Sequence, residues 1–375
     1  MSQMSAVLYD HLFDFDVDHK FPKLSTQLRA AHTNSKVCDL KTINFVEPYE
    51  LTASSVGDFY KKNMREFMAL SKDIFDYVYA TAPLNIGGVV SLEEVSFIAS
   101  QVMPLGAFFD TNDAYVDAPN NMKLAQAFSC QIPEVATIIA CLFDKKPWLQ
   151  EYFGKTLALE KISQSLCIGY NPNTDVPMVD RVKHDSGFKN EYLIADVMYP
   201  WVTQPLKQLR MMIPALPKET ISKILKVLES DDNKMLMPHT DYCHEHTYDC
   251  VTDFISYMML RTDPTPYKRD FTRQIWTPFF GIANYELLKT TIKDEKLLER
   301  IDKAFLASKR LYVEILKTGF RYEAQYAVLG GMAGRFLING STAGMKHFYG
   351  QDQYSKPAKD IASEIQKDVY GTPWT

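Results

Sequence analysis

Apolar residues recur at steps of three and four along most of the chain, which is the spacing of amphipathic helices. The longest such run covers residues 295–328, with Leu297, Ile301, Phe305 and Ile315 on one stripe. Similar patterns predict further helices at residues 55–78, 91–107, 133–143, 155–167, 189–198, 202–213, 217–230 and 244–260. Alternation typical of a half-buried strand is nearly absent. The pattern therefore predicts a mostly α, multi-helix globular protein.

Two segments break this helical pattern. The first 50 residues space their phenylalanines irregularly, which predicts an extended N-terminal arm. Residues 169–187 are rich in Gly, Pro and Asn, which predicts a long, exposed, turn-rich loop and a candidate boundary. We therefore expect five consecutive regions, namely an arm at 1–50, an N-terminal helical region at 51–168, the exposed loop at 169–187, a C-terminal helical region with a basic surface at 188–350, and a tail at 351–375.

Composition narrows the class of protein. The apolar share is 46% and the charged share 23%, which is ordinary for a globular protein, whereas the aromatic share of 13% is high. No apolar stretch approaches the roughly 20 residues of a membrane span, and residues 1–5 do not resemble a secretory signal peptide. Six scattered cysteines indicate reduced thiols. We expect a cytoplasmic protein, or one inside a virion, that is not secreted and has no membrane partner.

The net charge of −5 is unevenly distributed. Residues 261–350 carry 15 Lys and Arg against 9 Asp and Glu, and aromatic residues lie between the basic ones. Such a surface suits a sequence-independent contact with an RNA backbone, although a solvated helix of mixed charge is the simpler explanation of the charge balance alone. The candidate contact residues are Lys268, Arg269, Arg273, Lys309, Arg310, Lys317, Arg321 and Arg335.

Two acidic segments suggest an enzyme. Asp110 and Asp113 follow two phenylalanines, and Asp253 and Ser256 stand about 140 residues later. Together with Arg321-Tyr322, these residues resemble the two metal motifs and the terminal Arg-Tyr pair of class I terpene synthases. That resemblance implies magnesium as a cofactor and a prenyl diphosphate as the substrate.

The magnesium ligands of that family are incomplete in this chain. Positions i, i+4 and i+8 of a helix share one face, and the expected helix at 244–260 would place Thr252, Ser256 and Leu260 there. A leucine cannot bind a hard cation, and Thr111 replaces an acidic residue in the first motif. The sequence therefore favours a protein without catalytic activity over an enzyme.

A second cluster contains residues that bind transition metals. His246 and Cys250 would lie one turn apart on the expected helix, and His239 and Cys243 would do so if that helix began earlier. The full set is His239, Cys243, His244, His246 and Cys250. Residues 317–345 also resemble haem-dependent aromatic oxygenases, which implies haem bound where Tyr322 stands. Metal-dependent or haem-dependent oxygenase chemistry is therefore a further alternative.

The remaining interpretation is a protein that assembles with itself. Incomplete catalytic motifs, many Phe and Tyr residues, reduced cysteines, an arm and a basic segment occur together. In length, helicity and aromatic content the chain resembles the helical coat proteins of double-stranded RNA viruses such as partitiviruses. The resemblance implies a capsid or nucleocapsid protein in the virion, which forms a homo-oligomer, packages RNA and needs no cofactor.

Overall fold

The computed structural model describes residues 45, 47–81, 92–107, 154–155, 158–163, 178–182, 190–229, 246–261, 263, 269–348 and 355–371. Helices make up most of these residues, so the prediction of a mostly α protein is confirmed at this level. The structure adds a four-stranded antiparallel sheet. The expected N-terminal arm and the helices expected at 133–143 lie outside the described residues.

The chain forms two compact units whose segments alternate along the sequence. The first unit takes in residues 1–48, 108–170 and 186–243, and the second takes in residues 49–107, 171–185 and 244–375. The five consecutive regions expected from the sequence do not follow this division, because each unit gathers segments that are far apart in the chain.

The described residues of the first unit include three helices with defined bounds, all of them predicted, and residues 158–163 are also helical, within the helix predicted at 155–167. The three are α11 (Asn190–Met198), α12 (Leu206–Met212) and α13 (Lys218–Glu229). Two 3-10 turns follow α11 and α12, at Tyr199–Trp201 and Ile213–Ala215. Arg210 of α12 binds the Asp196 carboxylate at 3.0 Å and lies over the Tyr192 ring at 4.5 Å. These contacts join α11 to α12.

The second unit is built on the antiparallel sheet, which has the strand order β1-β2-β4-β3. The strands are β1 (Val179–Arg181), β2 (His246–Asp253), β3 (Arg269–Arg273) and β4 (Ala333–Gly340). The central pair aligns His246 with Gly340 and Asp253 with Ala333. Every residue of β4 is buried, so this strand lacks the alternation of a half-exposed strand.

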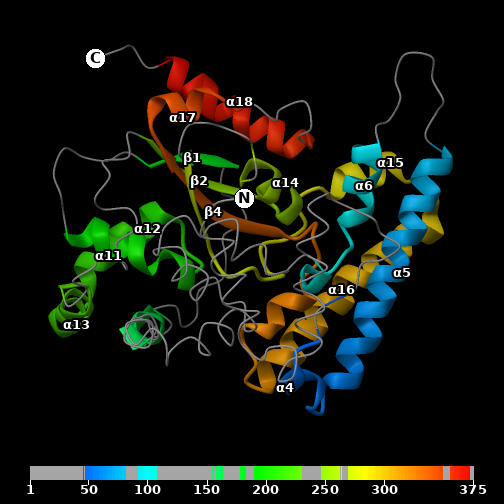
Figure 1. Ribbon diagram of the computed structural model, residues 1–375, viewed down its shortest axis with the longest axis horizontal. Helices are drawn as coiled ribbons and strands as arrows, with labels where there is room; N and C mark the ends of the chain where they lie inside the picture. Colours follow the sequence, from blue (N-terminus) through cyan, green and yellow to red (C-terminus); the bar gives the residue numbers. More distant parts are fainter. Residues whose placement is uncertain are drawn as a thin grey trace, which may run out of the picture. The chain divides into compact units, whose positions relative to one another are not determined.

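An aromatic cluster packs against one face of this sheet. Tyr257 lies on α14 (Phe254–Arg261), and its ring centroid is 4.9 Å from that of Phe336 in β4. Phe254 meets Trp276 edge-on at 5.4 Å. The helices α14, α17 (Thr342–Lys346) and α18 (Lys356–Gly371) contact the sheet, with α17 and α18 lying beside each other (Figure 1).

Four further helices belong to the described part of the second unit, together with the short helix α4 (Tyr49–Thr52). The long helices α5 (Gly57–Thr81) and α16 (Glu295–Lys317) run side by side (Figure 1). Arg300 of α16 binds the Asp73 carboxylate of α5 at 2.6 Å. The helix α6 (Leu92–Ser100) packs on α5, and α15 (Tyr285–Thr291) precedes α16.

Four predictions of secondary structure were wrong. Residues 246–253 form β2 instead of the first half of a helix, because β-branched and aromatic residues there pair with β4. The segment 91–107 is α-helical only to Ser100 and ends in a separate 3-10 turn at Leu105–Ala107. The region 169–187, expected to be a loop, contains β1. Helix α16 ends at Lys317 instead of continuing to 328, because Gly319 adopts a φ of 89° that ends the helix. Gly330 and Gly331 form a turn shortly before β4.

Candidate functional site

The structure describes most of the candidate functional residues. Asp110, Asp113, His239, Cys243, His244 and Lys268 lie outside the described residues. The others occupy three places, which are a buried network at Asp253, a cluster at His246, and a set of basic side chains on the sheet and on α16.

The Asp253 network lies at the junction of β2 and α14. The Asp253 carboxylate accepts hydrogen bonds from the backbone N–H of Ser256 at 2.9 Å, from the Ser256 hydroxyl at 2.5 Å, and from Asn284 Nδ2 at 2.7 Å. Asn284 also donates to Gln101 Oε1, and the Ser256 hydroxyl pairs with the Ser355 hydroxyl at 2.7 Å. Asp253 thus caps the first turn of α14 and joins three other segments.

Asp253 is fully buried, and this burial dominates its electrostatics. Burial raises the pKa of the Asp253 carboxyl, and the hydrogen bonds from Ser256 and Asn284 oppose that effect. Thr252 lies on the strand β2 while Ser256 lies on α14, so the helix face expected to hold magnesium does not exist. The structure uses Asp253 and Ser256 to start a helix, and Leu260 is part of the core.

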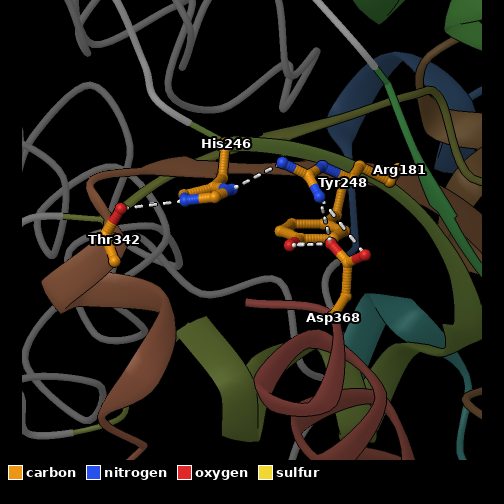
Figure 2. Close-up of polar contacts among 5 residues, drawn as sticks. All are labelled: Arg181, His246, Tyr248, Thr342 and Asp368. Carbon is orange, nitrogen blue, oxygen red and sulfur yellow. Dashed lines mark hydrogen bonds and ion pairs between the residues drawn. The ribbon is translucent and has the colours of Figure 1, made fainter. Parts of the chain in front are cut away.

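The His246 cluster consists of Arg181, His246, Tyr248, Thr342 and Asp368, and Figure 2 shows their polar contacts. Arg181 of β1 binds the Asp368 carboxylate of α18 at 3.1 Å, and the Tyr248 hydroxyl donates to the same carboxylate at 2.7 Å. His246 Nδ1 lies 3.5 Å from Arg181 Nη2, and His246 Nε2 lies 3.0 Å from the Thr342 hydroxyl. The cluster therefore ties β1 and β2 to α17 and α18.

The direction of these hydrogen bonds decides what the cluster can do. An arginine guanidinium can only donate, so Nδ1 of His246 accepts from Arg181. The tautomer that fits carries its proton on Nε2 and donates it to the Thr342 hydroxyl. A nucleophilic triad needs the opposite order, in which histidine accepts the hydroxyl proton and a carboxylate faces its other nitrogen. The arrangement holds elements together and does not activate Thr342.

Tyr248 and Cys250 are both deprotonated with difficulty. Burial raises the pKa of the Tyr248 hydroxyl, and the hydrogen bond and charge of Asp368 raise it further. Burial also raises the pKa of the Cys250 thiol. Neither group is therefore suited to act as a base or a nucleophile near neutral pH.

His246 and Cys250 do not have the helical spacing that the metal hypothesis assumed. Both residues lie on the strand β2, where four residues span about 13 Å, so they cannot share an ion as helical neighbours one turn apart would. Within the part of the chain that the structure describes, no group of three or more His, Cys, Asp or Glu side chains could hold a metal ion.

The basic residues expected to contact RNA divide into buried and exposed sets. Arg335 forms an ion pair with Asp249 at 3.1 Å, and both side chains are 1% exposed. Arg269 forms a buried ion pair with Asp263, and the buried Arg273 donates to Gln325 Oε1 at 3.2 Å. These three arginines stabilise the sheet region and do not present their charges to a phosphate backbone.

The remaining basic candidates lie at or after the C-terminal half of α16. Arg310 and Lys317 are exposed, and Lys309 and Arg321 are partly exposed. Lys317 binds the Glu314 carboxylate at 2.7 Å. Arg321 and Tyr322 follow the end of α16 in a turn, where Tyr322 precedes the 3-10 turn Glu323–Ala327, so Tyr322 is not the helical residue that the haem hypothesis required.

Several residues of both networks were missed from the sequence. Arg181, Thr342 and Asp368 come from three elements distant in the chain, and no local pattern marks them. Ser355 and Asn284 carried a weak signal, because each stands immediately before a helix, at a position where Ser and Asn are preferred. That signal predicts a helix start and not a network.

No known protein family matches the sequence, and comparison with curated proteins and with solved structures found no significant similarity. Among the described helices, none is long and apolar enough to cross a membrane.

Proposed function

We propose that the protein is a structural component that assembles with copies of itself, as the coat or nucleocapsid protein of a small RNA virus does. The observation that carries this proposal is a group of large apolar side chains left on the surface of the second unit. Its members are Phe59, Tyr79, Phe279, Leu306, Leu316 and Tyr370. Tyr79 is 66% exposed and Leu306 is 57% exposed.

Two of these side chains lie near the buried Tyr312. The Phe279 ring meets the Tyr312 ring edge-on at 5.6 Å, and Leu316 lies one turn after Tyr312 on α16. Aromatic side chains are enriched in the contacts between proteins, because a rigid ring buries much area for little lost entropy. These exposed side chains therefore suit contact with another protein surface.

The hydrogen bonds that Asp253 and His246 make support the same proposal. Each of these polar side chains, which an enzyme could have used, is engaged in linking secondary-structure elements of the second unit. The contact with RNA that we propose is weak for each copy, since only Lys309, Arg310, Lys317 and Arg321 of the described candidates reach the surface. Many copies acting together would be needed to hold RNA.

Electron microscopy of the purified full-length protein, together with the ratio of absorbance at 260 and 280 nm, tests the proposal. We expect closed particles or rings, with a ratio that shows bound nucleic acid. Nuclease treatment before purification separates assembly from RNA binding, since assembly through protein contacts should survive it. A monodisperse monomer at high concentration with the absorbance of protein alone would contradict the proposal.

A further inference from the structure

The outward face of α16 has an ordered distribution of charge. Its buried stripe includes Leu297, Ile301, Phe305 and Ile315, and the opposite side of the helix faces water. That outward face carries Glu295, Glu299, Asp302, Lys303, Leu306, Lys309, Arg310, Val313 and Lys317. Lys309 and Val313 are partly exposed and the others are exposed.

Acidic residues occupy the first half of this face and basic residues occupy the second half. Glu295, Glu299 and Asp302 stand before Leu306, whereas Lys309, Arg310 and Lys317 stand after it. Lys303 is the exception, and it binds the Glu299 carboxylate at 2.8 Å. Leu306 is the middle residue of this 23-residue helix and is 57% exposed.

We propose that this face pairs antiparallel with the same face of a second copy, about a two-fold axis beside Leu306. The inference rests on the proposed self-association and specifies one of its contacts. A two-fold axis places one surface patch against itself, so such a patch must be self-complementary. The opposite charges of the two halves of α16 meet that condition, because antiparallel pairing sets each acidic half beside the other copy's basic half.

The helical geometry indicates which side chains would meet. Glu295 and Lys317 are equally far from Leu306, so Glu295 lies level with Lys317 of the second copy. Asp302 and Lys309 lie on the same flank of the helix at opposite sides of Leu306, so Asp302 faces Lys309 of the second copy. Glu299 stands seven residues before Leu306 and Arg310 four residues after it, so Glu299 lies on the same flank as Arg310 of the second copy but about one turn away along the helix. Lys303 lies closer to that arginine, and its charge is offset by Glu299, which it binds at 2.8 Å. Each contact occurs twice, and the two Leu306 side chains meet at the axis.

These ion pairs determine orientation and register more than strength. Exposed ion pairs are individually weak and are screened by salt, so the apolar contact at Leu306 and further contacts in an assembly must contribute to the affinity. RNA is the competing occupant of the basic half of this face. RNA would leave the acidic half without a role, whereas a second copy uses both halves.

Cross-linking through a single introduced cysteine tests the position of the axis. In the full-length protein we expect Leu306→Cys to form a disulfide-linked dimer under mild oxidation, because the two Cα atoms at the axis come within roughly 7 Å. Leu316→Cys is the matched control on the same helix, where the two cysteines would be about 30 Å apart. The wild-type chain controls for its own 6 cysteines. Equal cross-linking of both variants, or none for Leu306→Cys, would overturn the inference.

Reversing the charges tests the complementarity. The acidic-half variant is Glu295→Lys with Glu299→Lys, and the basic-half variant is Arg310→Glu with Lys317→Glu. Measured by analytical ultracentrifugation, each should weaken self-association about tenfold or more at low salt. An equimolar mixture should recover association, because opposite charges again face each other on both sides of the axis. The control Glu66→Lys with Asp76→Lys reverses two exposed acids on α5 and should leave association unchanged.

The outcomes separate the inference from the proposed function. Particles that still form with unchanged affinity in both α16 variants would refute the α16 contact and leave assembly standing. Dimers that follow the charge pattern without ever forming particles would support the contact and refute the coat function. A basic-half variant that loses only its bound RNA, while an acidic-half variant behaves as wild type, would assign this face to RNA instead.

Discussion

Removing the Asp253 carboxylate should destabilise the second unit strongly. In Asp253→Ala the backbone N–H of Ser256 and the side-chain amide of Asn284 both lose an acceptor inside the protein. A lost helix N-cap costs about 1 kcal/mol, and each buried donor left unsatisfied costs about 1–3 kcal/mol. The variant no longer buries a carboxyl group, which offsets part of this loss. We therefore expect the free energy of unfolding to fall by about 3 kcal/mol.

A second N-cap provides the matched control. Asp294 begins α16 and accepts hydrogen bonds from the backbone N–H groups of Lys296 and Leu297, at 2.9 and 3.1 Å. These bonds lie at the surface, so water can replace the carboxylate in Asp294→Ala, and we expect a loss of about 1 kcal/mol. The difference between the losses of unfolding free energy in the two variants measures how much burial adds to the contribution of the cap.

Urea unfolding followed by far-ultraviolet circular dichroism measures both variants, at a protein concentration below that of assembly. We expect a much lower midpoint for Asp253→Ala than for Asp294→Ala. Equal midpoints would refute the view that Asp253 is a buried cap. A rise in the wild-type midpoint on adding magnesium, absent from Asp253→Asn, would instead show that Asp253 binds a metal ion.

Four further predictions concern the second unit. Gly334→Ala should destabilise by about 1–3 kcal/mol in urea unfolding, because the added Cβ would lie 2.3 Å from the Trp276 ring. Gly319→Ala, which has open space but a φ of 89°, should cost only about 1 kcal/mol. The pKa of Asp253 is raised above 3.8, so the folded protein holds that proton more tightly than the unfolded chain does. Unfolding titrations should therefore show wild-type stability falling relative to Asp253→Asn as pH rises through the window above 3.8. We expect iodoacetamide to alkylate the buried Cys250 only after unfolding, as detected by mass spectrometry. Fast alkylation of Cys250 in the folded protein would contradict its burial.

Predictions from local pattern were accurate where a helix has one buried face. Helix α5 and most of α16 follow the three- and four-residue spacing of their apolar residues, and α13 begins at the expected position after Pro217. Such helices can be recognised from the sequence because one side packs against the core and the other side faces water. Even there, the conformation of Gly319 decided where α16 ends.

The strands were missed because burial on both faces removes the two-residue alternation of polar and apolar side chains. β2 and β4 lie in the centre of the sheet with most or all of their residues buried, so polar and apolar residues do not alternate. A run such as Phe336-Leu337-Ile338 is equally compatible with a buried helix. Pairing between residues about 90 positions apart, such as Tyr248 with Ile338, selected the strand, and a local pattern carries no record of that pairing.

The sequence by itself determined the mostly α fold class, several amphipathic helices and the incompleteness of the catalytic motifs. Leu260 could not bind a cation in any fold, so its lack of a ligand atom was visible at once. Only the tertiary structure decided what Asp253, His246 and the arginines do. Their charges and hydrogen bonds depend on partners such as Asn284, Asp368 and Asp249, which folding brings close from distant segments. The physical reason is that burial requires each polar group to find a partner, and the fold supplies those partners.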